Sequence, residues 1–290
     1  MNDPINQSLF LPGYSPVRKK VSWEAKPDSR LLPLSPNVGM ELVKVEAGCF
    51  LMGSLEDDAE RFENEIPQKK CIQKDFWIGK YPVTNEQYGV LMKNDVEPYC
   101  HFNISWDAPV AYVNWDDAIE FCQKLTSQEE KLGRLPQGYI YSLPTEAQWE
   151  YAARGGIKSQ GFKYSGSNNI KEVAIYGCEW GAQPVGTLAP NELGLYDMSG
   201  NVLEWCLDAC SVGFRGGFHW YNFQEIQYVK TDEWFKQNPD KIKNEEGRIV
   251  RGGGYYFQKA EQCRLTARYC SYHKYKDSVI GFRLALVPNQ

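Results

Sequence analysis

The feature that most constrains the fold is the C-terminal stretch of residues 251–290, in which two kinds of sequence alternate. Residues 264–268 and 282–287 alternate in side-chain type or are continuously apolar, which is typical of half-buried and buried strands. The segments beside them lack core periodicity and carry Tyr255, Tyr256, Phe257, Tyr269, Ser271, Tyr272, His273 and Tyr275. Tyrosine offers large amphipathic contact area at low entropic cost, so we expect these side chains to form an exposed contact surface. The alternative is that they are ordinary core, since tyrosine is often largely buried.

Composition narrows the class of protein. Aromatic residues make up 14% of the 290 residues, which is high and favours a loop-rich fold in which aromatic side chains hold the loops. The net charge of -5 argues against a nucleic-acid-binding surface. No apolar run approaches the roughly 20 residues that a membrane-spanning helix needs. The first residues lack the basic start and apolar segment of a secretory signal.

Cysteine and histidine usage argues against a zinc site. The nine cysteines include no CxxC pair, and only three histidines accompany them, so zinc-ligand spacing is absent. The odd number favours mostly buried free thiols over a disulfide framework.

The chain reads as one α+β domain behind an N-terminal extension. Residues 1–38 are proline-containing and aperiodic, and we expect an extended arm there, followed by a single domain over 39–290. Strands are predicted at 41–45 and 76–83. Helices should begin at the capping boxes of Thr84 and Thr145, and a third after Asn114, with Asp116 and Asp117 in its first turn. After residue 156 aperiodic loops dominate, including the aromatic segment 213–221.

Seven ordered blocks carry a resemblance that covers about residues 40–287. The blocks are residues 50–54, 80–88, 109–115, 143–156, 194–202, 251–253 and 281–283. In this order they resemble the formylglycine-generating enzyme, or sulfatase-modifying-factor, family. The resemblance implies a variant of the C-type lectin fold: α+β, with few helices, twisted antiparallel sheets and much irregular structure.

The same resemblance places the catalytic residues of the family on unsuitable side chains. Its enzymes oxidise a substrate cysteine with two cysteines that bind copper and a nearby serine. Here the serine position is Gly254 and the cysteine positions are Phe257 and Gln262, with Cys263 one residue off. Phenylalanine and glutamine neither ligate copper nor exchange disulfides, so we expect no enzyme of this kind. Calcium near Asn201 and Glu204 is a family feature, but local hydrogen bonding explains these residues at least as well, and we predict no cofactor.

A second resemblance is to the variable proteins of diversity-generating retroelements, which use this fold to bind ligands. Their framework pattern matches residues 251–253, Cys263-Arg264 and residues 281–283, and their variable region would correspond to about 251–284. The positions implied to vary are Tyr255, Tyr256, Phe257, Tyr269, Cys270, Ser271, Tyr272, Tyr275, Asp277, Ser278 and Val279. Each is a residue type that can be reached by randomising an Asn codon.

We therefore expect a non-enzymatic binding protein whose C-terminal surface engages a protein or other macromolecular ligand. The predicted contact set consists of the positions just given together with His273, bordered by His219 and Trp220 of the 213–221 loop. We expect a monomer. The resemblance implies display on a bacterial cell surface, often through a lipid anchor for which this sequence shows no signal; a cytoplasmic location stays open. Two alternatives remain: an oxidoreductase that uses displaced residues such as Cys263 and Cys270, and a scaffold module with an invariant surface.

Overall fold

The computed structural model describes residues 28–92, 105–211 and 246–289 of the chain. Residues 1–27 of the expected arm therefore lie outside the described part. So does the 213–221 loop, with His219 and Trp220.

Five strands form the larger sheet, in the spatial order β1-β2-β5-β13-β6, and every neighbouring pair in it is antiparallel. The strands are β1 (Ser29–Pro33), β2 (Gly39–Val45), β5 (Phe76–Gly79), β6 (Tyr139–Ser142) and β13 (Ala285–Pro288). Strand β5 lies within the predicted range 76–83. Strand β2 covers the predicted range 41–45 and begins slightly earlier, at Gly39. The expectation of an extended arm up to residue 38 is wrong for residues 29–33, because these pair with β2 as the edge strand of the sheet.

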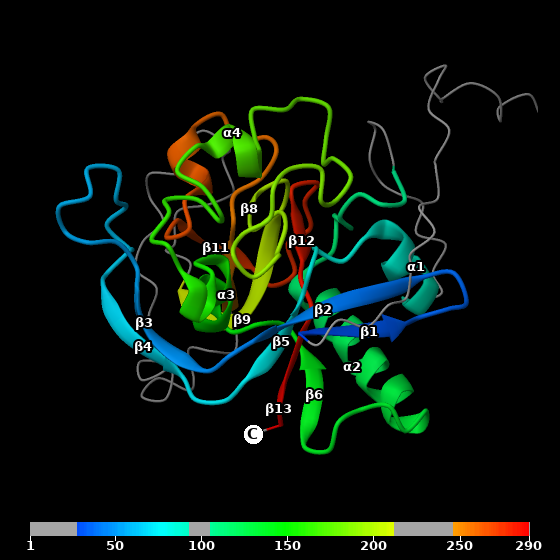
Figure 1. The fold of residues 1–290 in the computed structure, drawn as a ribbon. Coiled ribbons are helices and arrows are strands. Elements are labelled where there is room, and N and C mark those ends of the chain that lie inside the picture. The colour runs from blue at the N-terminus through cyan, green and yellow to red at the C-terminus, as the bar shows by residue number, and fades with distance from the viewer. Residues whose placement is uncertain (1–27, 93–104, 212–245, 290) are drawn as a thin grey trace, which may run out of the picture.

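A second sheet of four strands lies at the centre of the molecule in the order β11-β10-β9-β12 (Figure 1). Its strands are β9 (Leu203–Ser211), β10 (Glu246–Arg251), β11 (Arg268–Tyr272) and β12 (Ile280–Phe282). Strand β12 runs parallel to β9, whereas the other two pairings are antiparallel. Two small sheets complete the set: the hairpin β3 (Gly48–Met52) and β4 (Gln68–Ile72), and the parallel pair β7 (Ala174–Ile175) and β8 (Ser199–Gly200).

The helices are α1 (Asn85–Met92), α2 (Trp115–Lys131), α3 (Glu146–Ala153) and α4 (Ile170–Val173), with the 3-10 turns η1 (Gly156–Lys158) and η4 (Ala260–Cys263). Three of the helices, α1, α2 and α3, begin where the sequence predicts, whereas α4 and the two 3-10 turns lie in the region where only loops were expected. Both predicted capping boxes are present, since Thr84 accepts from the Gln87 amide at 3.3 Å and Thr145 accepts from that of Gln148 at 3.2 Å. None of the helices in the described ranges is long and apolar enough to cross a membrane.

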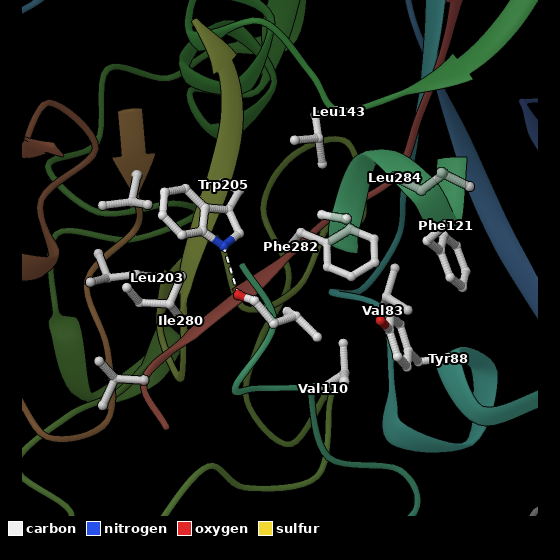
Figure 2. Close-up of a cluster of buried hydrophobic side chains, with 14 of the residues drawn as sticks. Val83, Tyr88, Val110, Phe121, Leu143, Leu203, Trp205, Ile280, Phe282 and Leu284 are labelled. Carbon is white, nitrogen blue, oxygen red and sulfur yellow. Dashed lines mark hydrogen bonds between the residues drawn. The ribbon is translucent and has the colours of Figure 1, made fainter. Parts of the chain in front are cut away.

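Helix α2 shows how local signals fix the core. Its cap is reciprocal: Asn114 accepts from the Asp117 amide at 2.8 Å, and the Asp117 carboxylate accepts from the Asn114 amide at 2.9 Å. The predicted apolar face is buried, and Phe121 lies edge-on to Phe282 of β12 with ring centroids 5.3 Å apart. Figure 2 shows this aromatic cluster continuing to Trp205 of β9, whose indole NH donates to the Val113 carbonyl at 3.0 Å.

Two strands predicted near the C-terminus differ from those observed. Residues 264–267 alternate in sequence but form a turn, and β11 begins only at Arg268. Residues 282–287 are not one strand, because β12 ends at Phe282 and β13, which begins at Ala285, belongs to the other sheet. Arg283 and Leu284 therefore form the crossing between the two sheets.

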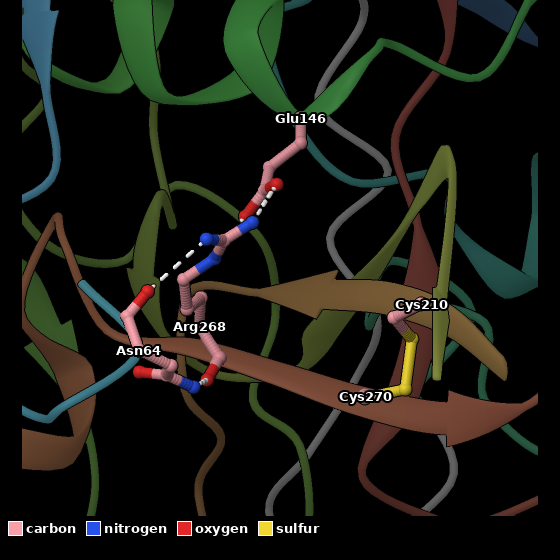
Figure 3. The surroundings of a disulfide bond; sticks show 5 residues. All are labelled: Asn64, Glu146, Cys210, Arg268 and Cys270. Atoms are coloured by element: carbon pink, nitrogen blue, oxygen red, sulfur yellow. Dashed lines mark hydrogen bonds and ion pairs between the residues drawn. A yellow bond between two sulfur atoms is a disulfide. The ribbon is translucent and has the colours of Figure 1, made fainter. Parts of the chain in front are cut away.

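Two disulfides overturn the expectation of mostly free thiols. Cys49 and Cys71 occupy directly paired positions of β3 and β4. Cys210 of β9 bonds to Cys270 of β11, the two strands that flank β10 (Figure 3). Cys122, Cys178, Cys206 and Cys263 are free thiols.

Candidate functional site

Two segments of the C-terminal region lie together and form the candidate surface: residues 255–257 after β10 and residues 272–279 between β11 and β12. The Tyr255 hydroxyl donates to Ser278 Oγ at 3.1 Å, which joins the segments directly. Both are also attached to β9 and the turn before it, because Tyr255 N donates to the Asn201 carbonyl and Leu203 N donates to the Val279 carbonyl, each at 2.7 Å.

The structure exposes part of the predicted contact set. Tyr256 and Tyr272 are exposed, with 47% and 37% of their surface accessible. His273, Tyr275 and Ser278 are half-buried. These five residues are the ones that can present side-chain atoms at the surface, and we refer to them as the exposed set.

The expectation that the whole contact set is exposed is wrong. Seven of its positions are buried: Tyr255, Phe257, Tyr269, Cys270, Ser271, Asp277 and Val279. The surroundings of two of them show why. Cys270 is in the disulfide with Cys210, and Val279 lies 3.5 Å from the point where a Cβ on Gly254 would sit. For these residues the alternative weighed from the sequence, ordinary core, describes their placement.

Phe257 and Tyr269 are the clearest case of core side chains beneath the surface. Their rings meet edge-on with centroids 5.5 Å apart, and the Tyr269 hydroxyl donates to the Gln262 carbonyl at 2.8 Å. Phe62 also packs on Tyr269, at 6.5 Å between centroids. A buried tyrosine needs a partner for its hydroxyl, and here a main-chain carbonyl supplies it.

Three framework arginines are buried, and each pairs with a buried glutamate. Arg283 pairs with Glu204 through three nitrogen–oxygen contacts of 2.8–3.2 Å, and Arg264 pairs with Glu65 through two of 2.8–2.9 Å. Arg251, the third framework arginine, pairs with Glu150 of α3 through one nitrogen–oxygen contact and lies 3.6 Å from Glu146. A buried charge needs such a partner, so these arginines stabilise the framework rather than the contact surface.

Arg268 adds a fourth ion pair beneath the surface. Its guanidinium donates to Glu146 of α3 at 2.7 Å and to the Asn64 carbonyl at 3.1 Å. Figure 3 shows this arrangement close to the Cys210–Cys270 disulfide. Strand β11 is therefore held at its first residue by ion pairing and at its middle residue, Cys270, by a covalent bond.

The framework glycines are required by space. A Cβ on Gly281 would lie 2.3 Å from the Val110 carbonyl oxygen, and one on Gly253 would lie 2.6 Å from Cys263 Sγ. Gly253 also has a φ of +78°, in the left-handed region that glycine adopts without strain. Gly254 differs, because its nearest neighbour, Val279, would be at an ordinary contact distance.

The start of helix α2 holds the 272–279 segment in place. Trp115 N donates to the His273 carbonyl at 2.9 Å. The two acidic residues of the first turn bind the segment as well, since Asp116 lies 3.1 Å from His273 Nδ1 and Asp117 lies 2.7 Å from Lys276 Nζ. The interpretation of these acids as helix-start residues is correct but incomplete, because they also bind the candidate surface.

Two exposed aromatic residues close to the candidate surface were not among the predicted contact residues. Tyr112 is 39% exposed, has a φ of +57°, and its amide donates to the Asp277 carbonyl at 2.9 Å. Trp180 is 69% exposed and follows Cys178, whose amide donates to the Tyr255 carbonyl at 2.8 Å. The sequence signal for Trp180 was the same as for the tyrosines, an aromatic residue in an aperiodic glycine-rich stretch. Nothing in the sequence distinguishes Tyr112.

Copper does not fit the side chains at the family positions. Phe257 fills the first with a buried ring, and the Gln262 side chain accepts from the Lys259 amide at 3.2 Å. The neighbouring Cys263 is buried, and burial raises the pKa of its thiol to about 12, which disfavours the thiolate that binds metal. Within the described residues, no group of three His, Cys, Asp or Glu side chains could hold a metal ion.

Calcium does not fit Asn201 and Glu204 either. Both Glu204 oxygens accept from Arg283, and Oε2 also accepts from the Trp149 indole at 2.7 Å. Asn201 Oδ1 accepts from the Gln183 amide at 3.0 Å. Oxygen lone pairs committed to internal donors, and a carboxylate neutralised by arginine, are poor ligands for a divalent cation.

Two known proteins are similar to this chain in sequence. The chaperone protein LppX of Paenibacillus barcinonensis is 35% identical over 213 residues, which are 58% of this chain and 71% of that protein. The formylglycine-generating enzyme of Thermomonospora curvata is 24% identical over 312 residues, covering 85% of this chain and 93% of the enzyme.

Solved structures of two proteins share the fold. Variable protein 1 of Treponema denticola superposes with a TM-score of 0.66 at 26% identity, over 90% of this chain and 99% of that one. PvdO from Pseudomonas aeruginosa gives 0.65 at 24% identity with the same coverage, which shows the fold alone. Residues 30–287 match the family described as the sulfatase-modifying factor enzyme 1-like domain, and the chain belongs to that family.

Proposed function

We propose that this protein is a non-enzymatic binding protein whose exposed set, Tyr256, Tyr272, His273, Tyr275 and Ser278, contacts a protein ligand. One observation carries the proposal: the main chain of the surface is fixed by the framework while aromatic side chains on it are exposed. Rigid tyrosines supply interface energy at low entropic cost, and His and Ser add adaptable polar contacts. The likeness to variable protein 1 of Treponema denticola supports the same use of the fold.

The finer proposal is that the exposed positions vary between copies of the gene. It rests on the framework being held from beneath. Arg251, Arg264 and Arg283 make their contacts in the interior, so changes at Tyr256 or Tyr272 leave those contacts intact. Sequencing several isolates tests it: differences should cluster at the exposed set, whereas uniform identity would favour an invariant scaffold. A template copy of residues 250–284 beside a reverse transcriptase gene would be the most direct support.

The competing function is oxidation of a substrate cysteine, as in the formylglycine-generating enzymes that the chain resembles. The side chains argue against it here, because Phe257 and Gln262 offer no thiolate pair and Cys263 is held as a thiol. A copper titration and a cysteine-peptide oxidation assay test this directly. Copper-dependent turnover would reverse the order of the two functions.

We further propose display outside the cytoplasm, on a bacterial cell surface. The support is the pair of disulfides, Cys49–Cys71 and Cys210–Cys270, since such bonds persist in oxidising compartments. Accessibility of Tyr272 to a membrane-impermeant label on intact cells is the measurement that checks it.

Photo-crosslinking tests the binding function. Benzoylphenylalanine is placed at Tyr256 or Tyr272, and at Ile157 as a matched exposed control on η1. A protein captured only from the first two positions is then purified and titrated by calorimetry. We expect Tyr256→Ala and Tyr272→Ala to weaken binding of that purified protein at least about tenfold. Equal capture at position 157, or unchanged affinity in both variants, contradicts the proposal.

A further inference from the structure

Asp277 lies within the candidate surface, yet its side chain is buried, with only 8% of the residue exposed. Its carboxylate accepts three hydrogen bonds: from the Tyr275 hydroxyl at 2.8 Å, from Ser278 Oγ at 3.3 Å and from Val279 N at 3.1 Å. All three donors belong to its own segment. A carboxylate satisfied in this way organises its neighbours and is poorly placed to contact a ligand.

The hydrogen bonds continue from Asp277 to the other segment of the surface. Tyr255 donates to Ser278 at 3.1 Å, and Ser278 in turn donates to Asp277. Donation therefore runs in one direction, from residue 255 through residue 278 to the carboxylate. Because charged acceptors strengthen the bonds donated to them, Asp277 is the natural end of this chain.

The main chain of Asp277 is fixed as firmly as its side chain. Its carbonyl accepts from Tyr112 N at 2.9 Å and from Ile280 N at 3.2 Å. Tyr112 precedes helix α2 and Ile280 is the first residue of β12, so the carbonyl is held between two framework elements. Asp277 therefore transmits the position of the framework to the side chains on either side of it.

We propose that Asp277 is the positioning residue of the ligand-binding surface, which orients Tyr275 directly and Tyr255 through Ser278. It thereby joins residues 255–257 and 272–279 into one rigid unit. This inference rests on the proposed function for its purpose, but the rigidity itself is measured without any ligand. It also places Asp277 among the residues that the surface must keep, in contrast to Tyr256 and Tyr272.

The surroundings of the Asp277 carboxyl support this role. Burial raises the pKa of the Asp277 carboxyl, whereas the hydrogen bonds from Tyr275, Val279 and Ser278 favour its ionised form. The neighbouring charges serve other partners, since His273 and Lys276 bind Asp116 and Asp117 on α2. Among the described residues, the carboxylate is thus satisfied by hydroxyl and amide donors rather than by a basic side chain.

Hydrogen–deuterium exchange of the full chain, read by mass spectrometry, tests the proposal. In Asp277→Ala we expect peptides covering 253–258 and 272–281 to exchange at least about tenfold faster, because 272–281 loses three hydrogen bonds and Ser278, the acceptor of Tyr255, loses its own acceptor. Asp277→Asn should restore most of the protection, since its carbonyl can accept from Val279 and its amide can donate to the Tyr275 hydroxyl. Tyr255→Phe should affect both segments more weakly, as it removes one link.

Asp75→Ala is the matched control, because Asp75 also accepts a main-chain hydrogen bond, from Ala47 at 2.8 Å, on another part of the fold. It should accelerate exchange around residues 44–48 and leave both surface segments unchanged. The proposal is overturned if Asp277→Ala leaves residues 253–258 protected, if exchange rises equally throughout the chain, or if Asp277→Asn behaves like Asp277→Ala. None of these outcomes depends on whether the crosslinking experiment finds a protein ligand.

Discussion

Arg283 and Glu204 are both completely buried and are joined by three nitrogen–oxygen contacts, the shortest of which is 2.8 Å. Arg283 lies where the chain passes from the four-stranded to the five-stranded sheet. It also donates to the carbonyls of Gly79 and Tyr196, each at 2.7 Å. One side chain thus ties together β5, β9 and the loop before β8, and the candidate surface is built on this junction.

Breaking this pair should unfold the junction. Arg283→Met leaves Glu204 as an uncompensated buried charge, which costs about 3–5 kcal/mol. The double variant Arg283→Met/Glu204→Gln should recover much of that loss, because no buried charge remains. Urea unfolding measures both, with Lys124→Met as a control, since the exposed Lys124–Glu120 pair on α2 is worth only about 0.3–0.5 kcal/mol. Equal loss in Lys124→Met and Arg283→Met contradicts the assignment.

The disulfide between Cys210 and Cys270 should stabilise the protein more than that between Cys49 and Cys71. It closes a loop of 60 residues rather than 22, so the chain-entropy estimate is about 4 kcal/mol against about 3 kcal/mol. Paired Cys→Ser variants, followed by urea unfolding, compare the two. Alkylation mapping of the native protein should leave all four of these cysteines unmodified; labelling at Cys270 without reductant would show that the bond is absent.

Stability should depend on pH through Asp197, a buried residue with a φ of +56°. Burial raises the pKa of its carboxyl to about 6, partly offset by the Gly186 amide and Arg283. The folded state then binds the proton more tightly than the unfolded state, so ionised Asp197 destabilises the protein above pH 6 and the cost disappears as pH falls toward 4. Relative to Asp197→Asn, wild type should gain about 2–3 kcal/mol in unfolding free energy between pH 7 and pH 4. A difference that is constant across this range would show that Asp197 does not titrate there.

Truncation of the buried aromatic residues of the C-terminal region should lower stability much more than truncation of the exposed ones. Tyr269→Ala and Phe257→Ala remove core rings and should cost about 3–5 kcal/mol, whereas Tyr256→Ala and Tyr272→Ala should change stability by less than about 1 kcal/mol. Urea unfolding of the four variants measures this directly. A large loss in Tyr272→Ala would mean that it belongs to the core and not to the contact surface.

Local signals in the sequence were sufficient for helices α1, α2 and α3 and for strands β2 and β5 of the larger sheet. Capping boxes at Thr84 and Thr145 and the apolar face of α2 depend on residues within one or two turns, and all of them are observed. The sheet crossing at Arg283 could not be predicted in this way. It depends on carbonyls of Gly79 and Tyr196, which are distant in the sequence.

The candidate surface was predicted in location but not in detail. Tyrosine density pointed to residues 255–257 and 269–279, yet it did not separate Tyr269, which packs on Phe257, from Tyr272, which is exposed. Burial of a strand residue depends on the register of β10 and β11, and that register is set by long-range pairing. The turn at residues 264–267 has a similar cause, because Arg264 is held by Glu65, which lies 199 residues earlier in the sequence.

Two glycines of the C-terminal region provide a final prediction, because they differ in available space. Gly281→Ala places a Cβ 2.3 Å from the Val110 carbonyl oxygen. Because that oxygen belongs to the main chain, the clash can be relieved only by moving β12, and we expect the free energy of unfolding to fall by about 3 kcal/mol or more. Gly254→Ala meets Val279 at 3.5 Å, an ordinary contact, and should cost less than about 1 kcal/mol. Thermal and urea unfolding measure the stability of the two variants, which carry the same substitution at sites 27 residues apart in the sequence. If Gly254→Ala is the more damaging change, Gly254 and not the approach of Gly281 to Val110 is the tighter point of the framework beneath the candidate surface.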